Sequence, residues 1–210
     1  MNYLFRHFDL VARLSLEHVW LVATALCIAL VIAVPAGIAV SRYRTLTTPV
    51  YGVLGIIYTI PSLALFALLI PLLGLGFWTA VIALAAYAQM ILVRNTAAAI
   101  SGVDASTVEA ARGMGMSAAQ TLWLVQRPLA MPVFVAGVRL ATVSLIGIAT
   151  IAAWINAGGL GSLVLDGIEH DYPDKAVAGA VAAVVLAFVA DYALRRLERV
   201  YSVAGRVART

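Results

Sequence analysis

The sequence predicts an all-α membrane protein with about five transmembrane helices, in a single domain over residues 1–210. Hydrophobic residues make up 63% of the chain and charged residues 11%, with a mean hydropathy of +1.00. A soluble domain has roughly one quarter charged residues. This much apolar surface does not fit in one small core, so the surrounding solvent must be a lipid bilayer. The net charge of +4 we interpret as loop basicity, and we expect no nucleic-acid partner.

Five apolar runs have the length needed to cross a hydrocarbon core, which takes about 20 helical residues. They cover residues 19–40, 50–73, 75–93, 129–157 and 176–194. Gly74 alone separates the second run from the third, and with Pro71 and Gly76 it predicts a tight turn. Proline inside a helix removes a hydrogen bond, so we expect Pro35 and Pro61 to bend the first and second spans.

Basic residues predict the orientation, because cytoplasmic loops concentrate Lys and Arg. If the N-terminus is outside, only three basic residues lie on the outer face, namely Arg6, Arg13 and Lys175. Ten then lie on the inner face, namely Arg42, Arg44, Arg94, Arg112, Arg127, Arg195, Arg196, Arg199, Arg206 and Arg209. This bias predicts an outer N-terminus, a cytoplasmic C-terminus and a cytoplasmic polar segment at residues 95–128.

The polar segment carries two helix-start signals with a glycine turn between them. Ser106 and Glu109 fit a capping box, in which the serine caps the helix and the glutamate reaches back to it. Gly113 and Gly115 then supply a C-terminal cap, because glycine adopts the left-handed conformation at little cost.

A second capping box follows at Ser117 and Gln120. It predicts a second helix that stops before Pro128. The expected structure of the segment is therefore helix, glycine turn, helix, placed outside the lipid between spans three and four. Such a helix pair outside the lipid is best explained by binding to a partner protein.

Residues 109–128 resemble the EAA loop of permease subunits of binding-protein-dependent ABC importers. Glu109, Ala110 and Ala111 are followed by Gly115 and, nine residues later, by residues 125–128, where Arg127 replaces the usual Leu. The resemblance covers about residues 14–200 and favours the osmoprotectant branch, which carries glycine betaine, choline or carnitine. The segments that resemble this branch are residues 60–64, 94–96, 109–117, 128–132, 136–139 and 157–161, together with Asp191.

The resemblance implies a MetI-like permease fold in the bacterial inner membrane, with the EAA loop as the coupling loop to the ATPase. The coupling residues it implies are Glu109, Ala110, Ala111, Gly113, Gly115 and Pro128, although Glu109 can also act only as a cap. The implied partners are two ABC ATPase subunits, a second permease copy or sister permease, and a periplasmic or lipid-anchored substrate-binding protein. The chain has no Gly-x-x-x-x-Gly-Lys-Ser/Thr loop for nucleotide, so it is a transport subunit and not itself an enzyme.

Several residues in or near the spans are candidates for the pathway or its gate. Gly158, Gly159 and Gly161 predict a helix break that shapes an outer gate, with a plain loop as the alternative. Arg139 at membrane depth either lines the pore or snorkels to the inner interface. Asp191 lies one helical turn before Arg195, which predicts an ion pair.

Three aromatic residues, Tyr58, Tyr87 and Trp154, can face the pathway, where such rings would stabilise a quaternary ammonium. Contact with lipid or neighbouring helices is the alternative. His18 and His170 lie near span ends without metal-ligand spacing, and we interpret both as interfacial. We expect no catalytic residues, no metal and no cofactor.

Other functions remain as alternatives. An importer for methionine or another small amino-acid-like solute would use the same architecture. A secondary transporter would need ionisable residues at mid-membrane and an inverted repeat. An intramembrane enzyme would need a motif such as His-Glu-x-x-His, which the sequence lacks.

Overall fold

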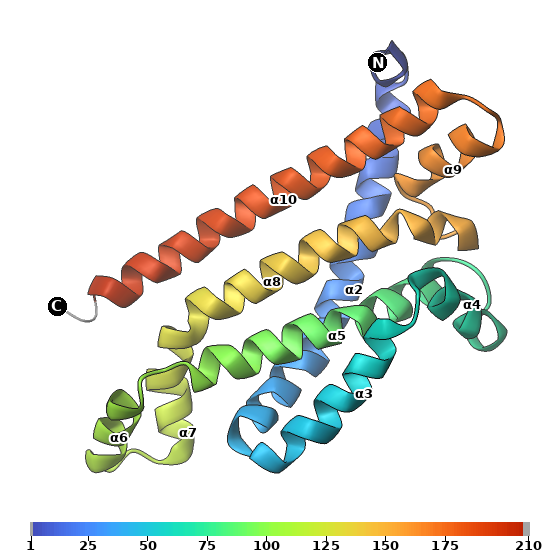
Figure 1. Cartoon of the computed structure of the whole chain (residues 1–210). Helices are drawn as coiled ribbons and strands as arrows, with labels where there is room; N and C mark the ends of the chain where they lie inside the picture. The colour runs from blue at the N-terminus through green and yellow to red at the C-terminus, as the bar shows by residue number, and fades with distance from the viewer. Residues whose placement is uncertain (1, 208–210) are drawn as a thin grey trace.

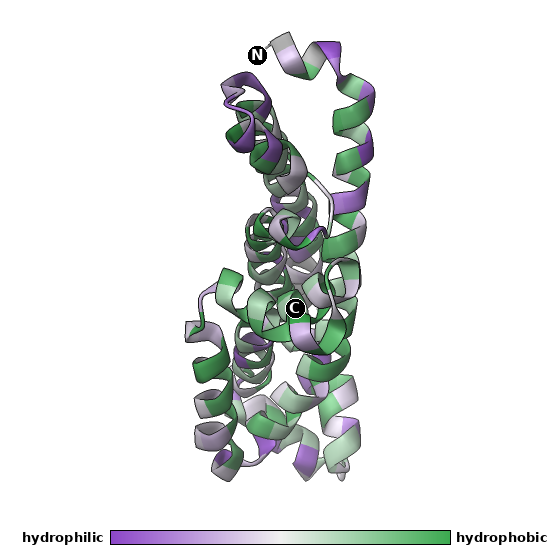
Figure 2. Cartoon of the chain, turned by 90° about the vertical axis from the view of Figure 1, so that its right-hand side faces the viewer, coloured by the Kyte–Doolittle hydropathy of each residue, from purple (hydrophilic) through white to green (hydrophobic). Residues whose placement is uncertain are grey.

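The computed structural model describes residues 2–207, and these residues form a bundle of helices without a strand (Figure 1). Arg209 therefore lies outside the described residues. Four helical segments are long and apolar enough to cross a membrane: α2 (Phe8–Arg42), α5 (Phe77–Ser101), Ala118–Ala149 and α10 (Pro173–Val207). A bent pair of helices passes the same test when taken together, which gives four crossings, or five with this pair, in agreement with the prediction of about five spans. Figure 2 shows hydrophilic residues gathered towards both ends of the molecule.

The bend predicted at Pro61 is confirmed, and it divides the second span into two helices. These are α3 (Thr47–Thr59) and α4 (Ser62–Leu73), which meet at an angle of 97°. Pro61 causes the break, because it lacks an N–H and drives the preceding Ile60 out of the helical region, to φ −66° and ψ 127°. The predicted turn after α4 is confirmed, since Gly74 and Gly76 both have positive φ.

Helix α5 is the centre of the bundle and contacts α2, α3, α4 and α8. Four small residues of α2 at a spacing of four form the stripe buried in this packing, namely Ala25, Ala29, Ala33 and Gly37. A Cβ added to Gly37 would lie 2.5 Å from the Cβ of Thr96 on α5. Small residues allow such close contact between helices in a membrane, where dispersion and not water exclusion stabilises packing.

The remaining helices lie around α2 and α5. Helix α8 (Arg127–Ala149) packs between α5 and α10, and α9 (Gly161–Glu169) packs on α10. The two short helices α6 (Ala105–Gly113) and α7 (Ala118–Gln120) lie together at one end of the bundle. We call this the α6 end. The opposite end, with α1 (Asn2–Arg6), α4 and α9, we call the α9 end.

Candidate functional site

The polar segment between the third and fourth spans is shorter than predicted. Helix α5 continues to Ser101, eight residues beyond the predicted end of the third span at 93. The first helix of the segment is capped by Asp104, whose carboxylate accepts the N–H of Ser106 at 3.1 Å. The predicted capping box of Ser106 and Glu109 is therefore wrong. The helix starts one residue before Ser106, which places this serine inside the first turn.

The glycine turn after α6 is confirmed at Gly115, whereas Gly113 is the last residue of the helix itself. Gly115 has φ +84°. Its N–H donates to the carbonyl of Arg112 at 2.9 Å, and the N–H of Met116 donates to the carbonyl of Ala111 at 3.2 Å. This pair of bonds is a Schellman motif, which ends a helix and reverses the chain while satisfying its last carbonyls.

The second capping box is also confirmed, since Ser117 and Gln120 bond reciprocally at 3.3 and 2.8 Å. The helix that it starts does not stop before Pro128, and this prediction is wrong. Helix α7 continues through a π-helical segment, Thr121–Gln126, directly into α8. Pro128 lies in the first turn of α8 after the register has shifted, a place where its missing N–H is tolerated. Helix α7 and the fourth span are thus one continuous element.

Both helices of the pair have exposed residues that are available to a partner. Glu109 and Ala110 are exposed, whereas only 2% of Ala111 is accessible. Gly113, Gly115 and Pro128 are exposed as well. We therefore restrict the predicted partner contact to residues other than Ala111, which supports the pair from inside. Arg127, which departs from the EAA pattern, lies over the ring of Trp123 at 5.1 Å.

One long-range contact, which is absent from the sequence predictions, connects this helix pair to the first span. Arg42, at the end of α2, donates from Nη2 to the carbonyl of Ala118 at 3.0 Å. No local signal predicts this bond, because the two residues are 76 positions apart. The cap at Asp104, in contrast, was available from the known preference of Asp for helix starts.

The predicted helix break lies at the other end of α8. A 3-10 turn, Ile151–Ile155, ends at Asn156 in the left-handed conformation, and Gly158 and Gly159 follow with φ +78° and +77°. A Cβ on Gly161 would lie 1.9 Å from the carbonyl oxygen of Thr150. The break is thus confirmed as a structure; its role as a gate stays a prediction. His18, interpreted as interfacial, is instead fully buried beside it.

Two of the three candidate aromatic residues meet at the bend of the second span. The rings of Tyr58 and Tyr87 pack edge to face with centroids 6.1 Å apart. The hydroxyl of Tyr87 donates to the carbonyl of Ile60, which the break at Pro61 leaves without a helical partner. Trp154 lies apart from this pair in the 3-10 turn after α8 and is exposed.

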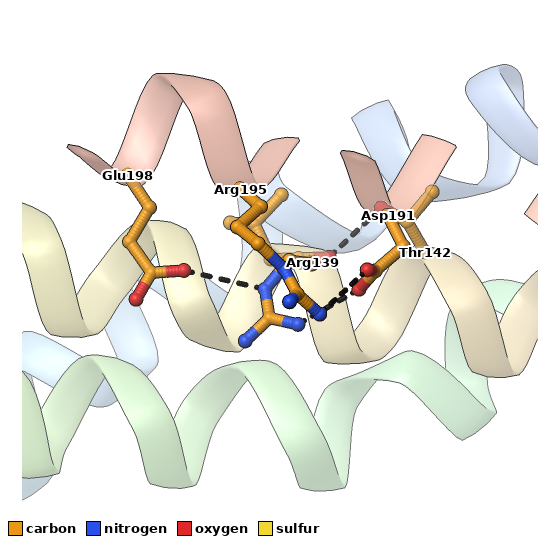
Figure 3. Close-up of polar contacts among 6 residues, drawn as sticks. Arg139, Thr142, Asp191, Arg195 and Glu198 are labelled. Carbon is orange, nitrogen blue, oxygen red and sulfur yellow. Dashed lines mark hydrogen bonds and ion pairs between the residues drawn. The ribbon is translucent and has the colours of Figure 1, made fainter. Parts of the chain in front are cut away.

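Arg139 is held by carboxylates of α10 (Figure 3). Its Nη1 lies 2.7 Å from Asp191 and its Nε 3.3 Å from Glu198, so the arginine bridges two turns of α10. The predicted pair of Asp191 and Arg195 is confirmed at 2.9 Å. This cluster explains a charge at membrane depth through pairing between helices. A pathway role for Arg139 stays a prediction.

Comparisons with known proteins agree with this architecture. Residues 25–203 match the family described as binding-protein-dependent transport system inner membrane component. The chain is 41% identical to the osmoprotectant import permease protein OsmW of Salmonella typhimurium, over 98% of both chains. It is 40% identical to the choline transport system permease protein OpuBB of Bacillus subtilis, over 90% of this chain and 87% of the other. Identity to the glycine betaine/carnitine/choline transport system permease protein OpuCB of Bacillus subtilis is 39%, over 87% and 84%.

A solved structure has the same fold. A chain of the MetNI methionine ABC transporter in an inward-facing conformation superposes with a TM-score of 0.82, over 92% of this chain and 97% of that chain. The two sequences are 24% identical, so the likeness supports the predicted MetI-like fold and nothing about substrate.

Proposed function

Because the chain belongs to the family of binding-protein-dependent transport system inner membrane components, we propose that it is the membrane-spanning subunit of an ATP-driven importer for osmoprotectants. The observation that carries the substrate class is its likeness to permeases named for osmoprotectants, choline, glycine betaine and carnitine. The substrate is thus a small quaternary ammonium compound. ATP hydrolysis takes place in two copies of a separate ATPase subunit.

Coupling depends on the α6–α7 pair. The exposed residues Glu109 and Ala110 contact the ATPase, and closure of the two ATPases displaces α6. Since α6 packs on the segment Thr121–Gln126 of the continuous helical path Ala118–Ala149, this displacement moves the fourth span. The bond from Arg42 to Ala118 carries part of the motion to the first span.

The pathway forms between two permeases, either identical copies or sister subunits. A periplasmic or lipid-anchored binding protein delivers the substrate to the α9 end.

Tyr58 and Tyr87 are the ring pair best placed to receive a quaternary ammonium, because Tyr58 is partly exposed at the bend of the second span. Replacement of Tyr58 by Leu should then raise the half-saturating concentration for uptake more than replacement by Phe.

The α6 end faces the cytoplasm and the α9 end faces outward. Single cysteines at Ser106 and Asp171, in a Cys27→Ala background, should therefore react with an impermeant maleimide from opposite sides. Both positions are exposed at opposite ends of the bundle. Reaction of both from the outside would contradict the orientation and the coupling role.

Reconstitution tests the whole proposal. The permease is co-expressed with its ATPase, placed in proteoliposomes and supplied with binding protein and labelled glycine betaine, choline, carnitine or methionine. We expect ATP-dependent uptake of at least one quaternary ammonium compound, by a complex with two copies of each type of subunit. Uptake of methionine alone would support the alternative amino-acid importer. Uptake driven by an ion gradient without ATPase would refute the ABC mechanism.

A further inference from the structure

A buried histidine of the first span contacts the helix break at the α9 end, and its neighbour in the sequence does the same. We propose that Glu17 and His18 form a latch that positions the break at residues 156–161, so that His18 is a positioning residue for the outer gate. The gate is the role predicted for these glycines and rests on the transport function proposed above, whereas the latch itself can be measured without transport. We call this pair of side chains the Glu17–His18 latch.

His18 uses both ring nitrogens to join two other elements. Its Nε2 lies 3.1 Å from the carbonyl oxygen of Ile146 in α8, and its Nδ1 lies 3.3 Å from the N–H of Leu160 at the start of α9. A carbonyl only accepts and an N–H only donates, so the ring is neutral, with its proton on Nε2. The side chain is fully buried. It thus connects α2, α8 and the start of α9 at one point.

Glu17 bonds to the same break at Gly159, one residue before the Leu160 that bonds to His18. Its Oε2 accepts the N–H of Gly159 at 3.3 Å. Its Oε1 lies 3.7 Å from Arg13, one turn before it on α2. The carboxylate is therefore oriented from its own helix and bonded to the break.

The glycines of the break fit these two side chains. A Cβ on Gly158 would lie 3.1 Å from Oε2 of Glu17, and a Cβ on Gly159 would lie 3.0 Å from Nδ1 of His18. Both glycines also have positive φ. A side chain at either position would therefore require Glu17 or His18 to shift by a few tenths of an ångström, which favours glycine here in addition to the turn itself.

The latch holds α9 over a small apolar cluster. Leu160 and Leu163 pack there with Leu14 of α2 and Ala178 of α10. If His18 loses its ring nitrogens, the carbonyl of Ile146 and the N–H of Leu160 lack partners in a buried place. Water or movement of α9 must then satisfy them. Release of the latch therefore exposes the surface under α9.

Thiol accessibility at Ala178 measures this release. Ala178 is 3% exposed, and a cysteine there, in a Cys27→Ala background, differs little in size. With the full complex in proteoliposomes, His18→Leu should raise the rate of reaction with an impermeant maleimide by about tenfold or more, because two buried polar groups lose their partner. His18→Asn keeps an acceptor near Nδ1 and His18→Gln keeps a donor near Nε2, so each should give an intermediate rate.

Two matched controls separate the latch from general loosening. His170→Asn changes an exposed histidine that bonds only within α9. Ser15→Ala removes a hydroxyl whose bond stays within α2. Both should leave the rate unchanged. If His18→Leu fails to accumulate, the maleimide rates of His18→Asn, His18→Gln and Glu17→Gln test the latch instead. Rates equal to the parent in every His18 and Glu17 variant that accumulates would refute the latch.

Uptake and ATPase activity then test the gate. His18→Leu should still co-purify with the ATPase, since the α6 end is intact, but its ATP hydrolysis should become independent of binding protein while uptake falls. Normal uptake with normal dependence on binding protein would refute the positioning role. If the parent complex shows no ATP-dependent uptake, the proposed function fails, while the maleimide rates still judge the latch.

Discussion

The chain reverses direction near both ends of α8, but different sets of bonds stabilise the two reversals. At the α6 end, bonds between residues close in sequence make the turn, such as Met116 to Ala111 and Gln120 to Ser117. At the α9 end, two similar local bonds, Asn156 to Ala153 and Ala157 to Ala152, are joined by bonds from α2 across 142 residues of sequence. The first end is a local unit that continues into a span and is suited to transmit motion. The second is a junction of three segments, because α2 also bonds to its backbone.

A substitution at the α9 junction should have the largest effect on the protein. Gly161→Ala places a Cβ 1.9 Å from the carbonyl oxygen of Thr150, so backbone must move. We expect a loss of at least about 3 kcal/mol of stability, seen as a lower thermal midpoint of the purified protein. Gly147→Ala is the control, because nothing lies within 4 Å of its added Cβ. Equal midpoints for the two variants would contradict the close approach at Gly161.

A bulky residue on α6 should abolish uptake and leave the fold intact. Ala110 is exposed, so Ala110→Trp blocks docking without disturbing the core. We expect normal membrane levels, loss of co-purified ATPase and no uptake. Ala193→Trp, at an exposed position of α10, should transport normally. Normal uptake by Ala110→Trp at normal expression would exclude α6 as the coupling surface.

The glycine turn at the α6 end should show a smaller effect. Gly115→Val forces a β-branched residue to φ +84°, which costs on the order of 1–2 kcal/mol and misdirects α7. Gly52→Val is the matched control, because Gly52 is helical in α3, lies away from the coupling pair and has open space around it. Uptake should fall only for Gly115→Val. A fall of equal size in both variants would show that the turn conformation does not matter.

The cap of α6 should show the smallest effect. Asp104→Ala removes the bond to the N–H of Ser106 and should cost about 1 kcal/mol in the stability of α6. Ser106→Ala should cost little, since this serine is not the cap. Hydrogen exchange of the α6 amides measures both. Greater exchange in Ser106→Ala than in Asp104→Ala would restore the capping box that the sequence suggested.

Much of the α6 end was predictable from residues alone. The Gly115 turn and the box of Ser117 and Gln120 are short-range signals, and both are confirmed. The error at Ser106 arose because two cap residues compete within one turn, and Asp104 comes first. The error at Pro128 arose because a π-helical segment shifts the hydrogen-bond register, which no residue pattern in that segment indicates.

At the α9 end the outcome was different. The glycines predicted a break, but not what holds it. His18 was interpreted as interfacial because it lies near a span end without metal-ligand spacing, whereas its partners lie 128 and 142 residues away. The pairing of Arg139 with α10 has the same origin, since Asp191 is 52 residues away.

The sequence by itself determined the number of crossings, the positions of the turns and the family, because span length, caps and glycine turns act within a few residues. The tertiary structure decided the 97° angle of the bend at Pro61, the burial of His18 and Ala111, and the continuity of α7 with α8. The physical reason is the solvent. In lipid, buried and exposed helix faces are both apolar, so hydrophobic periodicity does not identify the packed face, and only contacts between distant helices select it.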